Sequence, residues 1–229
     1  MVSPTRKKSN SKFREVLPDN IPGELKSRNQ WVVWRAEHRD GKLTKPPFNP
    51  STGGGAKVTD PATWAAFEIA LEAFQTGGFD GIGFVLTEDD GIVGIDGDHL
   101  LKSDGSFKNL GDKSTVDCLN TYTEVSPSGD GIRAFAFGKL PSGRRKNGSW
   151  EMYETGRFLT VTGNKTTDGV GVEQRQDELE LIHREKIEKS KEAKPKPQPT
   201  RPIDLSDQDL LEKAFRSRHG AKIRALYRG

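Results

Sequence analysis

The sequence predicts an α+β fold with a largely antiparallel sheet, and three observations support this class. Short apolar runs bounded by Gly, Pro, Ser or Asn recur between residues 81 and 162, as in turn-linked strands. A helix with apolar residues at spacings of three and four precedes them. Only 32% of the 229 residues are hydrophobic, and their runs concentrate between Trp31 and Gly163, so that stretch is expected to form the core.

The chain opens with a polar segment and a short strand. Residues 1–17 are polar and basic without periodicity, and they are predicted to form a flexible basic tail. Residues 31–34 have the sequence Trp-Val-Val-Trp and are a strand candidate. The polar stretch that follows runs through residues 45–50 to the glycines at 53–55. A loop of this length is usually either functional or disordered.

The clearest helix is predicted to begin at Asp60, which suits an N-cap, with Pro61 in its first turn. Gly77 ends it. Its apolar stripe consists of Trp64, Phe67, Leu71 and Phe74. A stripe with this spacing is typical of core packing and not of a ligand site.

Several strands are predicted after this helix. Residues 81–86 and 91–96 are apolar runs separated by an acidic turn, which predicts a β-hairpin. Further strand candidates are residues 121–125, 132–137, 149–153 and 158–162. Short connections of this kind favour antiparallel pairing.

The composition changes after Asn164, which divides the chain into four predicted segments. They are a basic tail at 1–17, a folded domain at 18–165, a charged helix with a Pro-rich linker at 166–202, and the start of a helical domain at 203–229. The last segment has helical spacing at Leu210, Leu211, Ala214, Ile223 and Leu226. Because it is too short to bury a core, we expect that the chain is cut from a longer protein.

The overall composition excludes some classes of protein and fits others. Cys118 is the only cysteine, so an intrachain disulfide and a thiolate metal site are both excluded, and a reducing cytoplasm fits. No apolar run approaches the roughly 18 residues of a membrane span, so we expect a soluble protein without a membrane partner. The net charge of +3 is too small to indicate a nucleic-acid partner by itself.

Asp96 and Asp98 are the sharpest chemical feature of the sequence. They lie at the end of an apolar strand candidate. Residues i and i+2 of a strand point to the same face, with backbones roughly 6 to 7 Å apart. Carboxylate ligands suit hard cations such as Mg²⁺ or Mn²⁺. The alternative is an ordinary acidic turn.

Glu151 lies in another strand candidate and is the predicted third acid, whereas Glu154 falls on the opposite face by alternation. Three such acids can hold the two ions of a phosphoryl-transfer site. A salt bridge or a cap is the alternative role for Glu151.

Two other segments are candidates for binding phosphates. In residues 126–133, glycines allow close approach, serine hydroxyls donate, and Arg133 offers a fork of donors. The basic cluster Arg144, Arg145 and Lys146 is a candidate contact for nucleic acid, with a solvated loop as the alternative.

The order of these motifs resembles the archaeo-eukaryotic primase superfamily, and specifically the primase-polymerases of phages and plasmids. The matching segments are residues 44–50, Asp96-Gly97-Asp98, residues 128–133, Glu151 and residues 155–163. The ordered set, which covers roughly residues 21 to 165, is far more specific than any single motif.

The resemblance implies a primase-polymerase catalytic core at 18–165 with an RRM-like sheet flanked by helices. It implies DNA primase and DNA polymerase activity in the replication of a phage or mobile element, with Mg²⁺ or Mn²⁺ held by Asp96, Asp98 and Glu151. The implied partners are a single-stranded DNA template, dNTP or NTP substrates and a helicase domain or subunit, in the host cytoplasm if a phage encodes the protein. The nucleotide-binding residues are then expected to be Lys45, Ser126, Ser128, Gly129, Arg133 and Arg157.

One residue departs from the family pattern, and two other functions remain open. Arg133 stands where the family usually has His, and an Arg can bind phosphate but cannot shuttle a proton. A phosphatase of the haloacid-dehalogenase type also uses Asp-x-Asp after an apolar strand, but it is expected to have the pair near the chain start, followed by helix-strand repeats. A non-catalytic primase-like module that binds DNA is the second alternative, although a cluster of acids weakens phosphate binding.

Overall fold

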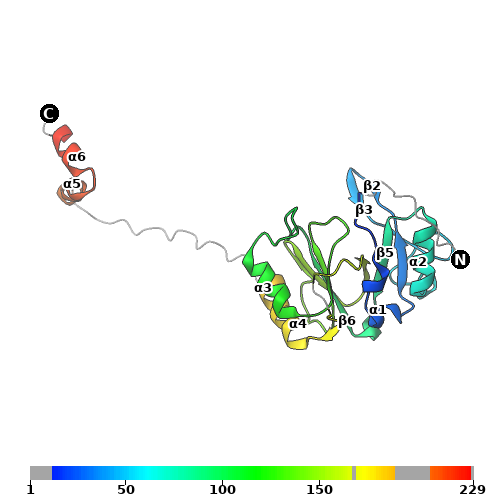
Figure 1. Cartoon of the computed structure of the whole chain (residues 1–229). Coiled ribbons are helices and arrows are strands. Elements are labelled where there is room, and N and C mark those ends of the chain that lie inside the picture. Colours follow the sequence, from blue (N-terminus) through cyan, green and yellow to red (C-terminus); the bar gives the residue numbers. More distant parts are fainter. Residues whose placement is uncertain (1–11, 167–168, 189–206, 228–229) are drawn as a thin grey trace. The chain divides into compact units, whose positions relative to one another are not determined.

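In the computed structural model, the described residues are 12–166, 169–188 and 207–227. The chain divides into two units, residues 1–189 and residues 190–229 (Figure 1). The second unit contains helices α5 (Asp207–Arg216) and α6 (Gly220–Tyr227). Every strand within the described residues belongs to the first unit.

The first sheet has four antiparallel strands in the order β11-β5-β1-β4. They are β1 (Trp31–Trp34), β4 (Pro47–Phe48), β5 (Gly81–Leu86) and β11 (Arg157–Val161). Helix α2 (Phe67–Thr76) packs against β1 and β5. There the rings of Phe67 and Trp31 meet edge to face, with centroids 5.0 Å apart.

The second sheet has the order β12-β8-β6-β10-β9, with β7 also paired to β8. Its strands are β6 (Ile92–Gly97), β7 (Thr123–Val125), β8 (Ile132–Phe137), β9 (Lys146–Asn147), β10 (Trp150–Tyr153) and β12 (Glu173–Gln174). All of these pairings are antiparallel except β12 with β8. The α+β class with antiparallel sheets is therefore confirmed.

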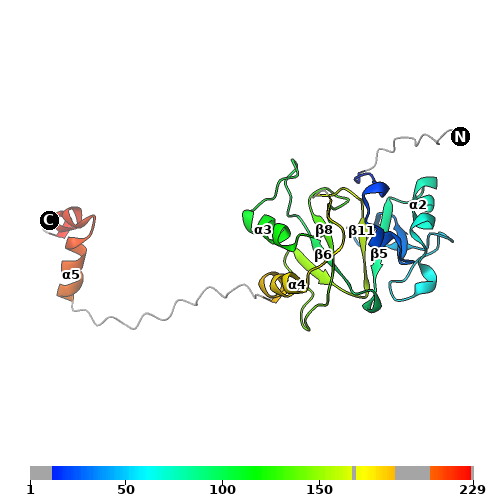
Figure 2. The same ribbon diagram turned by 60° about the horizontal axis from the view of Figure 1, so that its bottom comes forward.

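Helices cover one face of the second sheet, and the first sheet lies beyond the other face. The covering helices are α3 (Leu110–Leu119), α4 (Gln176–Ile182) and the π-helix η4 (His183–Glu188), and Figure 2 shows α3 and α4 on the side of β6 away from β5. Val93, Ile95 and Met152 point into this helical layer and are fully buried. The remaining elements are η1 (Pro18–Asn20), α1 (Gly23–Lys26), β2 (Glu37–Arg39), β3 (Lys42–Thr44), η2 (Pro61–Thr63) and η3 (Glu88–Asp90).

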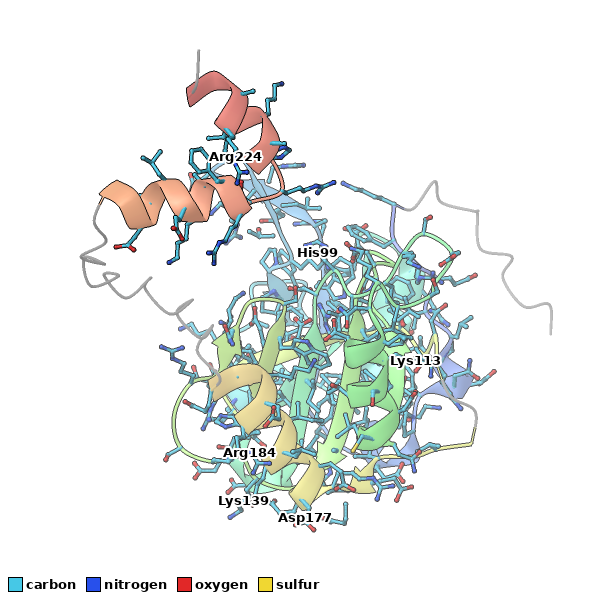
Figure 3. The ribbon with its side chains drawn as sticks, turned by 90° about the vertical axis from the view of Figure 1, so that its left-hand side faces the viewer. His99, Lys113, Lys139, Asp177, Arg184 and Arg224 are labelled. Atoms are coloured by element: carbon cyan, nitrogen blue, oxygen red, sulfur yellow. The ribbon has the colours of Figure 1, made fainter. Side chains whose placement is uncertain are left out.

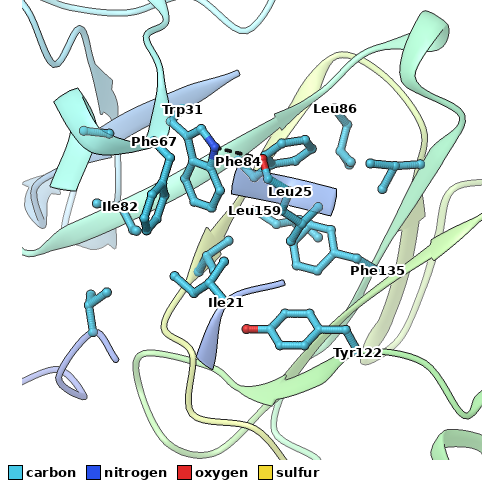
Figure 4. Close-up of a cluster of buried hydrophobic side chains, with 14 of the residues drawn as sticks. Ile21, Leu25, Trp31, Phe67, Ile82, Phe84, Leu86, Tyr122, Phe135 and Leu159 are labelled. Atoms are coloured by element: carbon cyan, nitrogen blue, oxygen red, sulfur yellow. Dashed lines mark hydrogen bonds between the residues drawn. The ribbon is translucent and has the colours of Figure 1, made fainter. Parts of the chain in front are cut away.

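A second buried cluster joins the two sheets (Figure 4). Phe84 of β5 and Phe135 of β8 meet edge to face with ring centroids 6.0 Å apart. The Trp31 indole is fully buried and donates its Nε1–H to the Leu25 carbonyl at 3.1 Å, so its polar group is satisfied inside the cluster. This packing holds the two sheets together.

The predicted helix from Asp60 is interrupted. Asp60 does accept a hydrogen bond from the Ala62 N–H at 3.2 Å, but it caps only the 3-10 turn η2, and α2 starts at Phe67. The reason is a pairing between Ala65 and Trp31, whose backbone groups exchange hydrogen bonds of 2.9 and 3.0 Å and hold the chain extended. Tertiary pairing overrides the local helical pattern here.

The predicted hairpin of residues 81–86 and 91–96 is wrong, because β5 and β6 belong to different sheets. Both strands are buried on both faces, and an apolar run of this kind does not specify its partner. The chain crosses between the sheets at η3. There the Asp90 carboxylate accepts hydrogen bonds from the backbone N–H groups of Thr87 at 3.1 Å and Ile92 at 2.7 Å.

The first unit extends beyond the folded domain predicted at 18–165. Val16 is 7% exposed in the core, and Leu17 N–H donates to the Thr162 carbonyl at 2.7 Å. At the other end, α4 and η4 bury Leu179, Ile182 and Ile187, although their sequence is rich in charges. Only one face of these helices is apolar, which explains why composition marked them as separate. Residues 1–11 and 189–206 lie outside the described residues.

Among the described helices, none has the length and apolar content needed to cross a membrane.

Candidate active site

A row of charged residues, here called the acid row, crosses the second sheet at the end of β6. Across neighbouring strands, Glu151 of β10 lies opposite Asp96 of β6, and Arg133 of β8 lies opposite Asp96 on the other side. Glu124 of β7 follows as the partner of Arg133. Directly opposite residues of antiparallel strands point to one face. Along β6, β8 and β10, the residues on either side of the charged ones point to the opposite face and pack under the helices. The charged row is therefore on the face toward the first sheet.

Arg133 connects the two aspartates. Its guanidinium forms an ion pair with Asp96, and its Nη2 lies 3.7 Å from Oδ1 of Asp98. The Arg133 side chain is 9% exposed and the Asp96 side chain 14%, whereas that of Asp98 is 45% exposed. Burial raises the pKa of Asp96 to about 7, with Asp98 and Glu151 adding to the effect and Arg133 opposing it. Asp96 therefore changes charge near neutral pH.

Glu151 has two hydrogen-bonding partners of its own. Lys146 of β9 pairs with its carboxylate, and the Tyr153 hydroxyl donates to it at 2.7 Å. Burial acts to raise the pKa of Glu151, but these two hydrogen bonds, together with the charges of Lys146 and Arg157, outweigh burial and bring the pKa below its usual value. Arg157 stacks on the Tyr153 ring, with its guanidinium 4.8 Å from the ring centroid. Arg157 is therefore linked to Glu151 through Tyr153, whose hydroxyl donates to the Glu151 carboxylate.

Lys45 approaches the same region from the loop between β3 and β4. Its ammonium lies 5.5 Å from the Trp34 ring centroid and 5.6 Å from that of Phe13, an arrangement that stabilises a partly desolvated cation. Burial lowers the pKa of Lys45, and the charge of Arg133 lowers it further, while Asp96 raises it. The first sheet thus brings a cation near the acids of the second.

The turn between β7 and β8 contains the predicted phosphate-binding residues. Ser128 donates to Asp130 at 2.6 Å, and the hydroxyls of Ser126 and Ser128 lie 3.1 Å apart. Gly129 has a positive φ of 86°, which favours glycine. A Cβ on Gly131 would lie 2.5 Å from the Gly97 carbonyl oxygen, so the turn can approach the end of β6 only with glycine there.

The predicted basic cluster is divided in the structure. Lys146 pairs with Glu151 and is part of the acidic site. Arg145 lies 3.4 Å from Glu154 and donates to the Pro141 carbonyl at 2.7 Å, which fixes the loop before β9. Arg144 is exposed. A role of these residues in binding nucleic acid stays a prediction.

Asp96, Asp98 and Glu151 offer only carboxylate oxygens, and oxygen is the type of ligand atom that a hard divalent cation prefers. Arg133 and Lys146 now contact those carboxylates. In the part of the chain that the structure describes, no three His, Cys, Asp or Glu side chains gather closely enough to hold a metal ion. Metal binding would therefore need these cations to move, and it stays a prediction.

Sequence reasoning missed Glu124, which is fully buried beside Arg133. Its carboxylate accepts hydrogen bonds from the Tyr122 hydroxyl at 2.5 Å and from the N–H groups of Thr162 at 2.8 Å and Gly163 at 2.7 Å. Burial raises its pKa to about 7. Two of the three donors, Thr162 and Gly163, are distant in sequence, so the only signal was an acid inside a strand candidate.

Comparison with known proteins identifies a relative of this chain. No protein-family model matches it. The chain is 39% identical over 140 residues to the DNA primase-polymerase of Nitratiruptor phage NrS-1. It is a homologue of that enzyme. The match covers 58% of this chain and 19% of the phage primase-polymerase, so the chain corresponds to a small part of its relative. The resemblance to the phage primase-polymerases is thereby confirmed.

Proposed function

We propose that this chain carries out template-directed nucleotidyl transfer, as a DNA primase and DNA polymerase, in the replication of a phage or mobile element. The observation that supports this best is the register of Asp96 between Glu151 and Arg133, with Asp98 following, in a homologue of a phage primase-polymerase. Carboxylates that would hold divalent ions and a guanidinium on one sheet face suit a reaction between a hydroxyl and a triphosphate. We also assign the RRM-like core of such enzymes to the second sheet.

The metal ligands in this proposal are Asp96, Asp98 and Glu151, and the metal is Mg²⁺ or Mn²⁺. When bound, divalent ions lower the pKa of an attacking hydroxyl and neutralise charge on the phosphates. Asp96 is the best-held ligand because its strand is central in the sheet and its side chain is buried. Arg133 and Lys146 balance the negative charge of the acids until the ions and the nucleotide enter.

The nucleotide's phosphates are proposed to lie between the acid row and the turn of residues 126–131. Arg133 and Lys45 supply positive charge from opposite sheets. The hydroxyls of Ser126 and Ser128 and the backbone of Gly129 supply donors at the turn. Arg157 contributes less directly, because Tyr153 separates it from Glu151.

The two other functions are weakened to different degrees. The haloacid-dehalogenase reading expects helix-strand repeats after the aspartates, whereas β6 has antiparallel neighbours on both sides. A non-catalytic DNA-binding module is favoured by one observation, which is that Arg133 and Lys146 already pair with the acids. It therefore remains the second candidate.

A primer-synthesis assay tests the proposal. The full chain would be incubated with a single-stranded DNA template, labelled dNTPs or NTPs, and Mg²⁺ or Mn²⁺, beside the variants Asp96→Asn and Asp98→Asn. We expect labelled products from the wild type and none from either variant, with all three proteins folded by circular dichroism. Equal synthesis by the variants, or no synthesis by a wild type that still binds the template, would favour the non-catalytic module.

A further inference from the structure

A second feature of the first unit lies beside the acid row and shares Ser128 and Gly129 with the proposed nucleotide site. It is a groove of about 550 Å³ between the segment before η1 and the loop after β6, with the β7–β8 turn between them. Its lining includes Lys12, Arg14, Lys102, Pro127, Ser128 and Gly129. The groove is open to solvent.

Backbone hydrogen bonds fix both walls of the groove to the turn. The Arg14 N–H donates to the Pro127 carbonyl at 2.9 Å, and the Leu101 N–H donates to the Asp130 carbonyl at 2.8 Å. A Cβ on Gly129 would lie 3.2 Å from Nε of Arg14, so the glycine permits the arginine to cross the turn closely. The groove is thus built into the fold by three segments distant in sequence.

The groove is lined by three cations and one carboxylate. Lys12, Arg14 and Lys102 are all exposed, and within residues 12–166, 169–188 and 207–227 no carboxylate forms an ion pair with any of them. Asp130 also lines the groove, but Ser128 donates to one of its oxygens at 2.6 Å and His99 lies 2.5 Å from the other. The surface therefore offers three cations to an anionic ligand.

We propose that this groove binds the sugar-phosphate backbone of the single nucleic-acid strand on which the enzyme acts. This inference rests on the proposed function and adds the place where the strand lies. Phosphodiesters are evenly spaced anions that lysine and arginine neutralise. The three cations are spread over two walls, which fits successive phosphates of a strand better than one compact triphosphate.

The position of the groove also favours a strand over a nucleotide. The wall that contains Lys102 follows Asp98 and His99 directly in the chain, so a strand in the groove leads to the acid row. The cations suited to a triphosphate, Lys45 and Arg133, already lie at that row. Strand and nucleotide thus have separate sets of cations.

The test compares two triple variants that remove equal charge. One is Lys12→Ala, Arg14→Ala, Lys102→Ala in the groove. The control is Lys113→Ala, Lys139→Ala, Arg184→Ala, and Figure 3 shows that Lys139 and Arg184 lie at the end of the first unit away from His99. All six side chains are exposed, so both proteins should keep the wild-type melting temperature. Binding of fluorescein-labelled poly(dT) to the full chains would be measured by anisotropy over a range of NaCl, without nucleotide or metal.

We expect the groove variant to lose affinity on the order of 100-fold near 0.1 M salt, with a salt dependence of log K reduced by about 2, since each lost phosphate contact removes about 0.7. The control should stay close to wild type. A methylphosphonate strand, which lacks backbone charge, should bind all three proteins equally weakly.

Three results would overturn the assignment: equal losses in both triple variants, no strand binding by the wild type, or unchanged strand binding with a raised nucleotide KM in the groove variant. If the wild type incorporates no nucleotide while only the groove variant loses strand binding, the proposed enzymatic function fails and the groove stands. The two proposals are therefore tested separately.

Discussion

Arg133 on β8 lies directly opposite Asp96 on β6, and its guanidinium forms an ion pair with the Asp96 carboxylate. The same guanidinium lies 3.7 Å from Asp98. Arg133 is thus a partner of the proposed metal ligands as well as a candidate phosphate contact. If divalent ions were bound by these carboxylates, as proposed, the Arg133 donors would be available to a triphosphate. Experiments can separate these two proposed roles of the position.

Replacing Arg133 tests the phosphate role. Arg133→Ala should raise the apparent nucleotide KM by roughly 10- to 100-fold, because a charge-assisted hydrogen bond contributes about 1.5 to 3 kcal/mol. Arg133→Lys should recover only part of this loss, since a point charge replaces a planar fork, and Arg133→His should retain substantial activity. Steady-state kinetics with varied dNTP would check it. An Arg133→Ala variant with altered stability but an unchanged nucleotide KM would limit Arg133 to pairing with Asp96.

Glu151 and Glu154 provide a matched pair. Glu151 lies in register with Asp96, whereas Glu154 accepts a hydrogen bond from the Leu140 N–H at 2.8 Å and pairs with Arg145. Glu151→Gln should reduce the turnover number at least tenfold, and Glu154→Gln should change turnover little while lowering the melting temperature slightly. Primer extension at saturating nucleotide and thermal melting would measure both. The reverse order of effects on turnover would remove Glu151 from the site.

The raised pKa of Asp96, about 7, predicts a pH effect on stability. A carboxyl whose pKa is raised by folding stabilises the folded state at low pH, and this contribution is lost as pH rises toward 7. Without divalent metal, the melting temperature of wild type relative to Asp96→Asn should therefore fall from pH 5 to pH 8. The buried Glu124 is present in both proteins and cancels.

Added Mg²⁺ should show the opposite trend, because the metal needs the ionised carboxylate. It should raise the wild-type melting temperature more at pH 8 than at pH 6, and it should have little effect on Asp96→Asn. A pH-independent Mg²⁺ effect that is equal in both proteins would argue against Asp96 as a ligand.

Sequence reasoning predicted the fold class well and the strand partners poorly, for one physical reason. Alternation and turn residues locate strands, but β5 and β6 are buried on both faces and carry no mark of which neighbour they pair with. They separate into two sheets because β5 pairs with β1 and β11, whereas β6 pairs with β8 and β10. These pairings join segments that are distant in sequence, and they are visible only in three dimensions.

The candidate site was predictable where its residues are close in sequence or form a motif. Asp96 and Asp98 are two positions apart at the end of a strand candidate, and Glu151 lies inside another strand candidate. The sequence pattern therefore made all three residues candidates. The aromatic contacts of Lys45 and two of the three donors to Glu124 come from distant segments. No local pattern predicts which distant segment packs on a given strand.

Glu124 is expected to be a structural requirement. In Glu124→Gln, the amide NH₂ would face a backbone N–H of Thr162 or Gly163 that now has a carboxylate acceptor. Leaving one buried donor unsatisfied should lower the free energy of unfolding by about 1 to 3 kcal/mol. Tyr122→Phe, which removes one donor and leaves two, is the control and should lose less. Urea denaturation would measure both, and a Glu124→Gln variant as stable as wild type would show that the network adds nothing.

The last prediction concerns residues 12–17, which fall inside the range predicted as a tail. Phe13 meets the Trp34 ring edge to face at 5.1 Å and also lies under the Lys45 ammonium, while Val16 is buried in the core. A chain that starts at Lys12 should keep the wild-type stability. A chain that starts at Pro18 should lose roughly 2 to 4 kcal/mol, because it exposes apolar surface of the core. It should also show a raised nucleotide KM, since Lys45 loses one of its two aromatic contacts. Urea midpoints and primer extension on both truncated chains would check this, and equal stability of the two would mean that the segment packs without contributing to the fold.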